Sequence, residues 1–135
     1  MENVTQPHQV IHPWVFVWRV ASDKTNYRRI INHHYIIDLI SVYYESAGLP
    51  ITSQVICGRS RRSLYVVPRY MAWYFIYKYS GLNSLKSVGL LFNRDHSTII
   101  NGIKRLKNYC ETERDTRKHF QNICQLLNVE EYEKG

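Results

Sequence analysis

The stretch Asn93-Arg94-Asp95-His96-Ser97-Thr98-Ile99-Ile100 decides the fold that we expect for this chain. Before it, residues 84–92 carry apolar side chains at helical spacing, which predicts a first helix. Asn93 then stands where a tight turn is needed, and asparagine tolerates the left-handed backbone conformation better than most residues. From Asp95 a second apolar stripe predicts another helix. Two helices joined by so short a turn predict a helix-turn-helix.

The outer face of the second helix is polar at its start and basic further along. Beyond the first turn, this face carries Asn101, Lys104, Arg105, Lys107 and Asn108. In a helix-turn-helix, the second helix enters the major groove of DNA and directs its first residues at base edges. The pattern therefore predicts a DNA-reading helix.

Positive charge is concentrated in one part of the chain. The whole sequence of 135 residues has a formal net charge of +7. Thirteen Lys and Arg residues lie between Gly58 and Lys118, against four Asp and Glu residues. A run of charge is usually only a solvated face, but an excess focused on one segment favours a polyanionic partner.

Composition and motif spacing restrict the class of protein. A hydrophobic content of 44% and an aromatic content of 13% predict a folded chain. The sequence has no secretory signal and no apolar run of about 18 residues, so we expect a cytoplasmic protein that contacts no membrane. Its glycines never take the G-x-x-x-x-G-K-[ST] spacing, which predicts that it binds no nucleotide.

Cysteine and histidine residues predict neither a metal site nor any other cofactor site. Cys57, Cys110 and Cys124 lack ligand spacing, and the last two fall among apolar helical positions, which favours buried free thiols. His33 and His34 are adjacent, so they do not converge on one metal ion.

The first 27 residues differ from the rest, and we expect them to form a short non-helical arm before a helical domain at 28–135. The run Trp14-Val15-Phe16-Val17-Trp18-Arg19-Val20 has a high β propensity. A strand, an arm lying over the core and an interaction peptide all fit this run. Residues 14–20 are thus a candidate contact for a protein partner.

The rest of the sequence predicts an all-α, compact bundle of about six helices. One helix is expected to end near Gly48-Leu49-Pro50, and Thr52 or Ser53 to cap a short one through Cys57. The segment Gly58-Arg59-Ser60-Arg61-Arg62-Ser63 is expected to be a basic loop. Asp115 is expected to open the last helix.

The helix expected from Arg69 to about Tyr79 is aromatic nearly all round. Pro68 is expected in its first turn. The all-round apolar character favours a buried central helix over a platform on which single strands stack. Gly102, inside the DNA-reading helix, predicts close packing against a neighbouring helix.

These features together resemble the C-terminal DNA-binding domain of the bacterial replication initiator DnaA. The resemblance is carried by the basic loop, the Pro68-Arg69 helix start and Arg94-Asp95-His96-Ser97-Thr98, where that family has Gly-Gly-Arg-Asp-His-Thr-Thr. It covers roughly residues 36–127. It implies the DnaA domain IV fold, which is similar to the Trp repressor.

The resemblance also implies roles for individual residues. Those that match base-reading residues of the major groove are Asp95, His96, Ser97 and Thr98. A carboxylate accepts from a base amino group, and a hydroxyl pairs with either kind of base edge. Ser97 lacks the methyl group of the family's threonine, so its apolar contact should be weaker.

For the minor groove, Arg61 matches the arginine of the family's basic loop, with Arg59 and Arg62 as close alternatives. A narrow A·T-rich groove concentrates negative potential and attracts a guanidinium. Arg69 matches an arginine that contacts the DNA backbone. The other residues expected at the DNA backbone are Arg59, Arg62, Arg94, Asn101, Lys104 and Arg105, and for Arg94, Lys104 and Arg105 a structural contact is the alternative.

Three departures from the family pattern affect the expected docking on DNA. Asn93 replaces the family's paired glycines, which tightens the turn by one residue. Tyr77 stands at the position of a backbone-contacting lysine, with Lys78 adjacent. The stretch from Glu45 to Gly58 is longer than its counterpart.

Asp95 has two interpretations that do not exclude each other. As an N-cap residue it would bond the amide of Ser97 or Thr98, and as a base reader it would face the groove. A hydrolase relay of Asp95-His96-Ser97 is excluded, because consecutive helical residues point about 100 degrees apart. We therefore expect no enzyme.

Our leading hypothesis is sequence-specific binding of duplex DNA at an A·T-rich box, in replication or transcription regulation of a bacterial, phage or mobile-element system. The alternative is a protein-interaction module that holds a replication or regulatory partner through Trp14, Phe16 and Trp18. A nonspecific binder of RNA or single strands is the third possibility.

Overall fold

In the computed structural model, residues 30–82 and 84–129 are described, and within them the chain forms six α-helices and no strand. The helices are α2 (His33–Ser46), α3 (Ser53–Cys57), α4 (Ser63–Tyr79), α5 (Leu85–Phe92), α6 (His96–Thr112) and α7 (Arg114–Leu127). The all-α prediction of about six helices is confirmed. The expected arm at 1–27, with its aromatic run at 14–20, lies outside the described residues.

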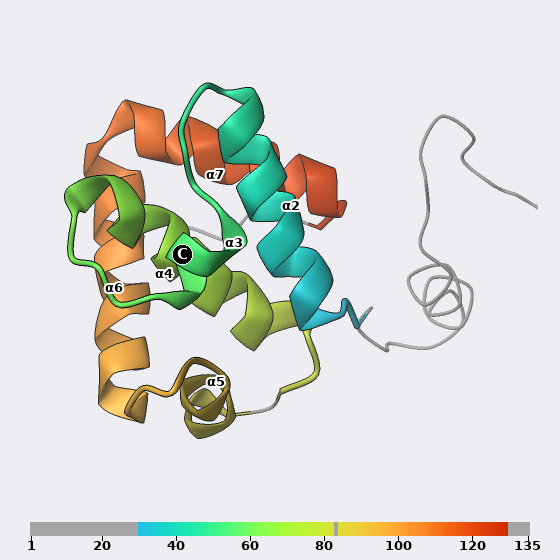
Figure 1. Ribbon diagram of the computed structural model, residues 1–135, viewed down its shortest axis with the longest axis vertical. Helices are drawn as coiled ribbons and strands as arrows, with labels where there is room; N and C mark the ends of the chain where they lie inside the picture. Colours follow the sequence, from blue (N-terminus) through green and yellow to red (C-terminus); the bar gives the residue numbers. More distant parts are fainter. Residues whose placement is uncertain (1–29, 83, 130–135) are drawn as a thin grey trace, which may run out of the picture.

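Helix α4 crosses the middle of the molecule, while α6 runs along one side with α5 near its beginning and α7 beyond its other end (Figure 1). Six consecutive α4 residues, Met71 to Ile76, are buried. The Phe75 ring stacks on Phe120 of α7 with a centroid distance of 5.1 Å. The aromatic helix is therefore the central helix of the core, as its apolar pattern predicts.

The start of α4 differs from the prediction. Pro68 is not in the first turn, because α4 begins at Ser63 and Pro68 is its sixth residue. A proline there has no N–H to donate to the carbonyl four residues earlier, so one helical hydrogen bond is missing. Pro68 itself is buried, whereas Ser63 and Leu64 are exposed. The sequence pattern thus marks the beginning of the fully buried part of α4 and misses the five residues before it, of which the first two are exposed and the next three half-buried.

Short polar side chains cap the helices near the predicted starts. The Thr52 hydroxyl accepts from the Val55 amide at 3.2 Å at the start of α3. The Ser84 hydroxyl accepts from the Ser87 amide at 3.0 Å at the start of α5. These caps satisfy amides that have no partner inside the helix.

Gly102 allows α6 to approach α4 closely. A Cβ atom at this position would lie 2.5 Å from Cζ3 of Trp73 and 2.9 Å from Cδ1 of Tyr70. Ile99 and Leu106, on the same side of α6, are buried. The close packing predicted for this glycine is confirmed, and it fixes which face of α6 remains outside.

The cysteines are free, and Cys110 and Cys124 are buried as predicted, while Cys57 is exposed. Within 30–82 and 84–129, no group of three metal-ligating side chains is placed to hold an ion. In the same ranges, every helix is too short or too polar to cross a membrane.

Candidate nucleic-acid interface

The turn between α5 and α6 is closed by a left-handed residue. Asn93 has φ 56° and ψ 48°, as predicted for this position. Its N–H donates to the Leu90 carbonyl at 3.2 Å, and the Arg94 N–H donates to the Gly89 carbonyl at 2.7 Å. A Cβ atom on Gly89 would lie 2.5 Å from the Arg94 carbonyl oxygen. The turn is therefore packed directly against the end of α5, and it sets the angle at which α6 begins.

The first turn of α6 presents its polar groups to solvent. Asp95 is the N-cap residue as predicted, but its side chain makes no capping hydrogen bond of normal geometry; the nearby Ser97 amide nevertheless helps to lower the pKa of the carboxyl group. The Asp95 carboxylate accepts a short hydrogen bond from the Ser97 hydroxyl instead. His96 Nδ1 lies 3.7 Å from Asp95 Oδ1, and the two side chains are 59% and 68% exposed.

These contacts keep the Asp95 carboxylate charged. The hydrogen bond from Ser97, together with the adjacent His96, lowers the pKa of Asp95. An ionised carboxylate can only accept hydrogen bonds. In a groove, it would therefore be matched to a base amino group.

Beyond the first turn of α6, exposed polar side chains continue along one side of the helix. Residues three, four, seven and eleven positions apart lie on one side of a helix. Opposite the buried side at Ile99, Gly102 and Leu106, this rule places the exposed residues Ser97, Asn101, Lys104 and Asn108. The predicted polar face therefore begins at Ser97, one of the four residues expected to read bases.

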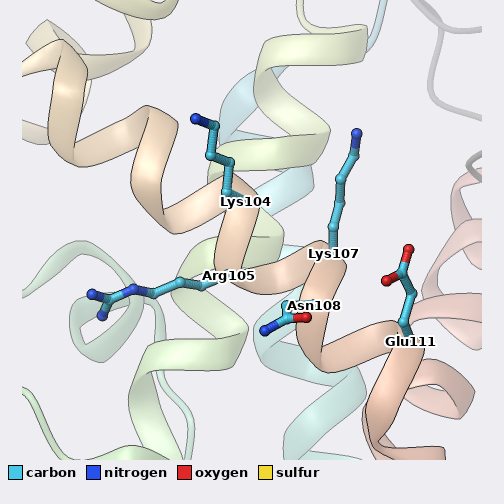
Figure 2. A pocket seen from close by; sticks show the side chains of 5 residues that line it. All are labelled: Lys104, Arg105, Lys107, Asn108 and Glu111. Atoms are coloured by element: carbon cyan, nitrogen blue, oxygen red, sulfur yellow. The ribbon is translucent and has the colours of Figure 1, made fainter.

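The C-terminal half of this face holds a shallow depression of about 420 Å³ (Figure 2). It is lined by Lys104, Arg105, Lys107, Asn108 and Glu111. In Figure 2 the Lys104 and Lys107 side chains extend on the same side, and Arg105 points to the other side of the helix. Three cations against one carboxylate leave this part of α6 positive, which suits contact with phosphate groups.

The basic loop at 58–62, between α3 and α4, lies against the turn that begins α6. Arg59 Nη2 donates to the Asn93 carbonyl at 2.6 Å. In the opposite direction, Arg94 Nη2 donates to the Gly58 carbonyl at 3.0 Å. Arg61 and Arg62 are exposed in the same loop. Two segments that the sequence predicts to enter different grooves are therefore held side by side.

Arg69 has an internal role that the sequence did not reveal. Its side chain is only 3% exposed. Its guanidinium donates to the carbonyls of Val55, Ile56 and Ser60 at 2.8, 3.1 and 2.7 Å. A direct contact with the DNA backbone, as predicted for Arg69, is incompatible with this burial. The only signal in the sequence was the position of this arginine among the buried residues of an apolar helix.

Four arginines close to one another make this region strongly positive. Burial, followed by the charges of Arg59 and Arg61, lowers the pKa of Arg94. Burial and then the charge of Arg94 lower the pKa of Arg69. Like charges gathered in this way repel one another, and a bound anion would relieve the repulsion.

Lys86 is a further candidate to which the sequence analysis gave no role. It is exposed in the first turn of α5. A cation there opposes the helix dipole, so the position does not benefit the helix itself. The first helix of a helix-turn-helix crosses the DNA backbone, which makes Lys86 a candidate phosphate contact.

Comparison with known proteins places this arrangement in a family. The family model described as the bacterial dnaA protein helix-turn-helix matches residues 34–106, more than half of the chain. The matched region contains α5, the turn and the first part of α6, together with the basic loop.

Relatives of the same kind match a longer segment. The chain is 33% identical to the chromosomal replication initiator protein DnaA 1 of Chlamydia pneumoniae over 94 residues, which are 69% of this chain and 19% of that protein. It is 31% identical to DnaA of Oleidesulfovibrio alaskensis over 60% of this chain and 17% of that protein. It is 28% identical to DnaA of Bacteroides fragilis over 74% of this chain and 21% of that protein.

The chain therefore spans about a fifth of the length of the curated relatives that it matches. The matched part is a helix-turn-helix, which is a DNA-binding and not a catalytic element. The chain belongs to the family of bacterial DnaA C-terminal helix-turn-helix domains.

Proposed function

We propose that this protein binds double-stranded DNA sequence-specifically, at an A·T-rich box, by contacting both grooves. The first turn of α6 enters the major groove and reads base edges through Asp95, His96, Ser97 and Thr98. Arg61, from the loop before α4, enters the adjacent minor groove, with Arg59 and Arg62 beside it. One observation carries the proposal: the loop is hydrogen-bonded to the turn from which α6 begins.

Contacts with the phosphate backbone fix the register in this proposal. The exposed residues suited to them are Arg62, Lys86, Asn101, Lys104 and Arg105. Such contacts position the protein, while the base contacts provide sequence specificity. Since relatives are named chromosomal replication initiators, we place the activity in replication or its regulation, in the bacterial cytoplasm. The 135 residues contain no nucleotide-binding loop, so binding and placement on DNA are the activities that we assign to them.

The test is fluorescence anisotropy with two duplexes, one carrying an A·T-rich DnaA-type box and one with the same bases scrambled. We expect tighter binding to the box, and a preference that persists when the salt concentration is raised. Affinity for both duplexes should fall with salt because phosphate contacts release counterions. Equal affinities for the two duplexes at both salt concentrations would contradict the proposal.

Arg61→Ala tests the minor-groove contact separately. We expect this variant to lose preference for A·T over G·C pairs at the flank of the box, while discrimination at the pairs read by α6 is retained. Lys118→Ala is the matched control, since Lys118 is an exposed basic residue on α7. If both variants change flank preference equally, Arg61 does not read the minor groove.

A further inference from the structure

Two of the arginines expected at DNA phosphates are engaged with the protein's own main chain. Arg59 reaches from the loop to the Asn93 carbonyl in the turn, and Arg94 reaches from the turn to the Gly58 carbonyl in the loop. The two bonds run in opposite directions and join residues 34 and 36 positions apart in the sequence. Together they form a reciprocal pair of arginine bonds between the loop and the turn.

The surroundings of Arg94 hold its guanidinium in one place. The side chain is partly buried, and its Cζ lies 5.7 Å from the centroid of the Trp73 ring. The planar guanidinium can stack on an aromatic ring while it donates to a carbonyl, which an ammonium group cannot do equally well. The Trp73 ring in turn contacts the site of Gly102, so Arg94, α4 and α6 meet at one point.

The loop end of this arrangement is also fixed. Arg69 donates to the Ser60 carbonyl and to two carbonyls of α3. Ser60 immediately precedes Arg61. The main chain on one side of the proposed minor-groove residue is therefore attached both to the core, by Arg69, and to the turn, by Arg59 and Arg94.

We propose that Arg59 and Arg94 are positioning residues that set the minor-groove loop relative to the major-groove helix, and that they do not bind phosphates themselves. This inference rests on the proposed function, because it concerns how the two groove contacts are coordinated. Each of the two guanidinium groups donates to a main-chain carbonyl of the opposite segment, which brings the like charges together. Simultaneous reading of two grooves requires a fixed spacing between Arg61 and the first turn of α6.

A positioning role and a phosphate contact for Arg59 and Arg94 predict different measurements. A residue that neutralises a phosphate contributes about 0.9 to the slope of log affinity against log salt concentration. A residue that only positions other groups contributes nothing to that slope, but its loss lowers discrimination in both grooves together. Salt slope and base discrimination therefore separate the two roles.

The experiment compares Arg59→Gln and Arg94→Gln with the wild-type chain on three duplexes: the box, the box with a changed flank pair, and the box with a changed major-groove pair. For both variants we expect an unchanged salt slope and a loss of roughly tenfold in discrimination at both changed pairs, as for a lost hydrogen bond to a charged group. Thermal unfolding establishes that each variant is folded. If Arg94→Gln does not fold, Arg59→Gln carries the test, because Arg59 is exposed.

Arg105→Gln is the matched control, since Arg105 is exposed on α6 and is expected at a phosphate. Its salt slope should decrease by about 0.9 while its discrimination is retained. If Arg59→Gln and Arg94→Gln behave like this control, the positioning role is wrong. A wild-type chain without any preference for the box would instead contradict the proposed function, and the positioning role with it.

Two further variants strengthen the test. Arg94→Lys keeps the charge. We expect it to recover little of the lost discrimination, because an ammonium group lacks the planar guanidinium that stacks on Trp73 while it donates to a carbonyl. In an Arg61→Ala background, Arg59→Gln should leave flank preference unchanged, since the residue that it positions is gone. Full recovery by lysine, or additive losses of flank preference in the double variant, would overturn the proposal.

Discussion

The core around α4 and the loop–turn region differ in the interactions that hold them. In the core, Phe75, Ile76 and Ile123 have no measurable exposure, and aromatic rings pack on one another. In the loop–turn region, arginine side chains reach main-chain carbonyls near the surface. Burial of apolar area supplies most of the folding free energy, whereas directed hydrogen bonds fix geometry. Mutations should therefore affect stability and DNA recognition separately.

Phe75→Ala is expected to lower stability most while leaving DNA recognition unchanged. Removing a fully buried aromatic side chain typically lowers the free energy of unfolding by about 3–5 kcal/mol, because a cavity remains. Urea denaturation measures this loss. At a temperature where the variant is still folded, its ratio of affinities for box and scrambled DNA should equal that of the wild type. A changed ratio would show that the core takes part in recognition.

His96→Ala should have the opposite effect, lowering DNA recognition while leaving stability nearly unchanged. We expect a loss of about 1–3 kcal/mol in discrimination at one base pair. The free energy of unfolding should change by less than about 0.5 kcal/mol, since the side chain is exposed. Thr98→Ala should lower base discrimination similarly at a neighbouring pair. A uniform loss of affinity for every duplex would instead indicate that neither residue reads bases.

Gly102→Ala alters a contact between the core helix α4 and the helix α6 that is proposed to bind DNA. Alanine favours a helix by about 1 kcal/mol over glycine, but the new Cβ would meet the rigid Trp73 ring. Overpacking of this kind typically costs about 1–3 kcal/mol. We expect a net loss of stability and, because α6 is pushed away from α4, weaker binding to the box. An increase in the melting temperature with unchanged binding would contradict this account of the contact.

Asn93→Ala should have a smaller effect, of about 1 kcal/mol in unfolding free energy, because alanine is strained at φ 56°. Asn93→Gly should recover that loss. Asn128, with φ 60° at the end of α7, offers a matched control. Asn128→Ala should lower stability similarly and leave DNA binding unchanged, whereas Asn93→Ala should weaken both.

The smallest effect at neutral pH concerns Cys110. Burial raises the pKa of its thiol to about 11, from an ordinary value of 9.0. The folded state therefore favours the protonated thiol, and this contribution is complete below pH 9. It is lost as the pH rises from 9 toward 11, because the unfolded chain releases the proton first. Between pH 9 and pH 11, Cys110→Ala should therefore lose less of the stability that it has at pH 7 than the wild type loses. Urea denaturation at a series of pH values measures this difference.

Much of the fold could be predicted because its signals are local. Thr52 and Ser84 are short polar side chains in front of apolar runs, and both cap helices. Asn93 adopts the predicted left-handed conformation. The start of α4 could not be predicted in the same way, because its first two residues, Ser63 and Leu64, are exposed and the proline rule places a helix start at Pro68. The proline rule gave the wrong boundary there, since this helix tolerates one missing hydrogen bond.

The candidate site was less predictable, because its contacts join distant parts of the chain. The sequence identified the basic loop and the turn but not their attachment to each other, since Arg59 and Asn93 are 34 residues apart. Nor could it show that Arg69 is buried, because an arginine on a helix is normally exposed. For Asp95, the cap rule identified the position correctly and missed that Ser97 competes for the carboxylate.

The bonds of Arg59, Arg69 and Arg94 have one property in common: every acceptor is a main-chain oxygen. Such an acceptor is present whatever side chain the residue carries. None of these bonds uses the Arg61 side chain, so we expect a substitution at position 61 to leave all of them in place. Under the proposed function, the main-chain bonds would then form a constant frame, and substitutions at Arg61 would change DNA preference without disturbing that frame.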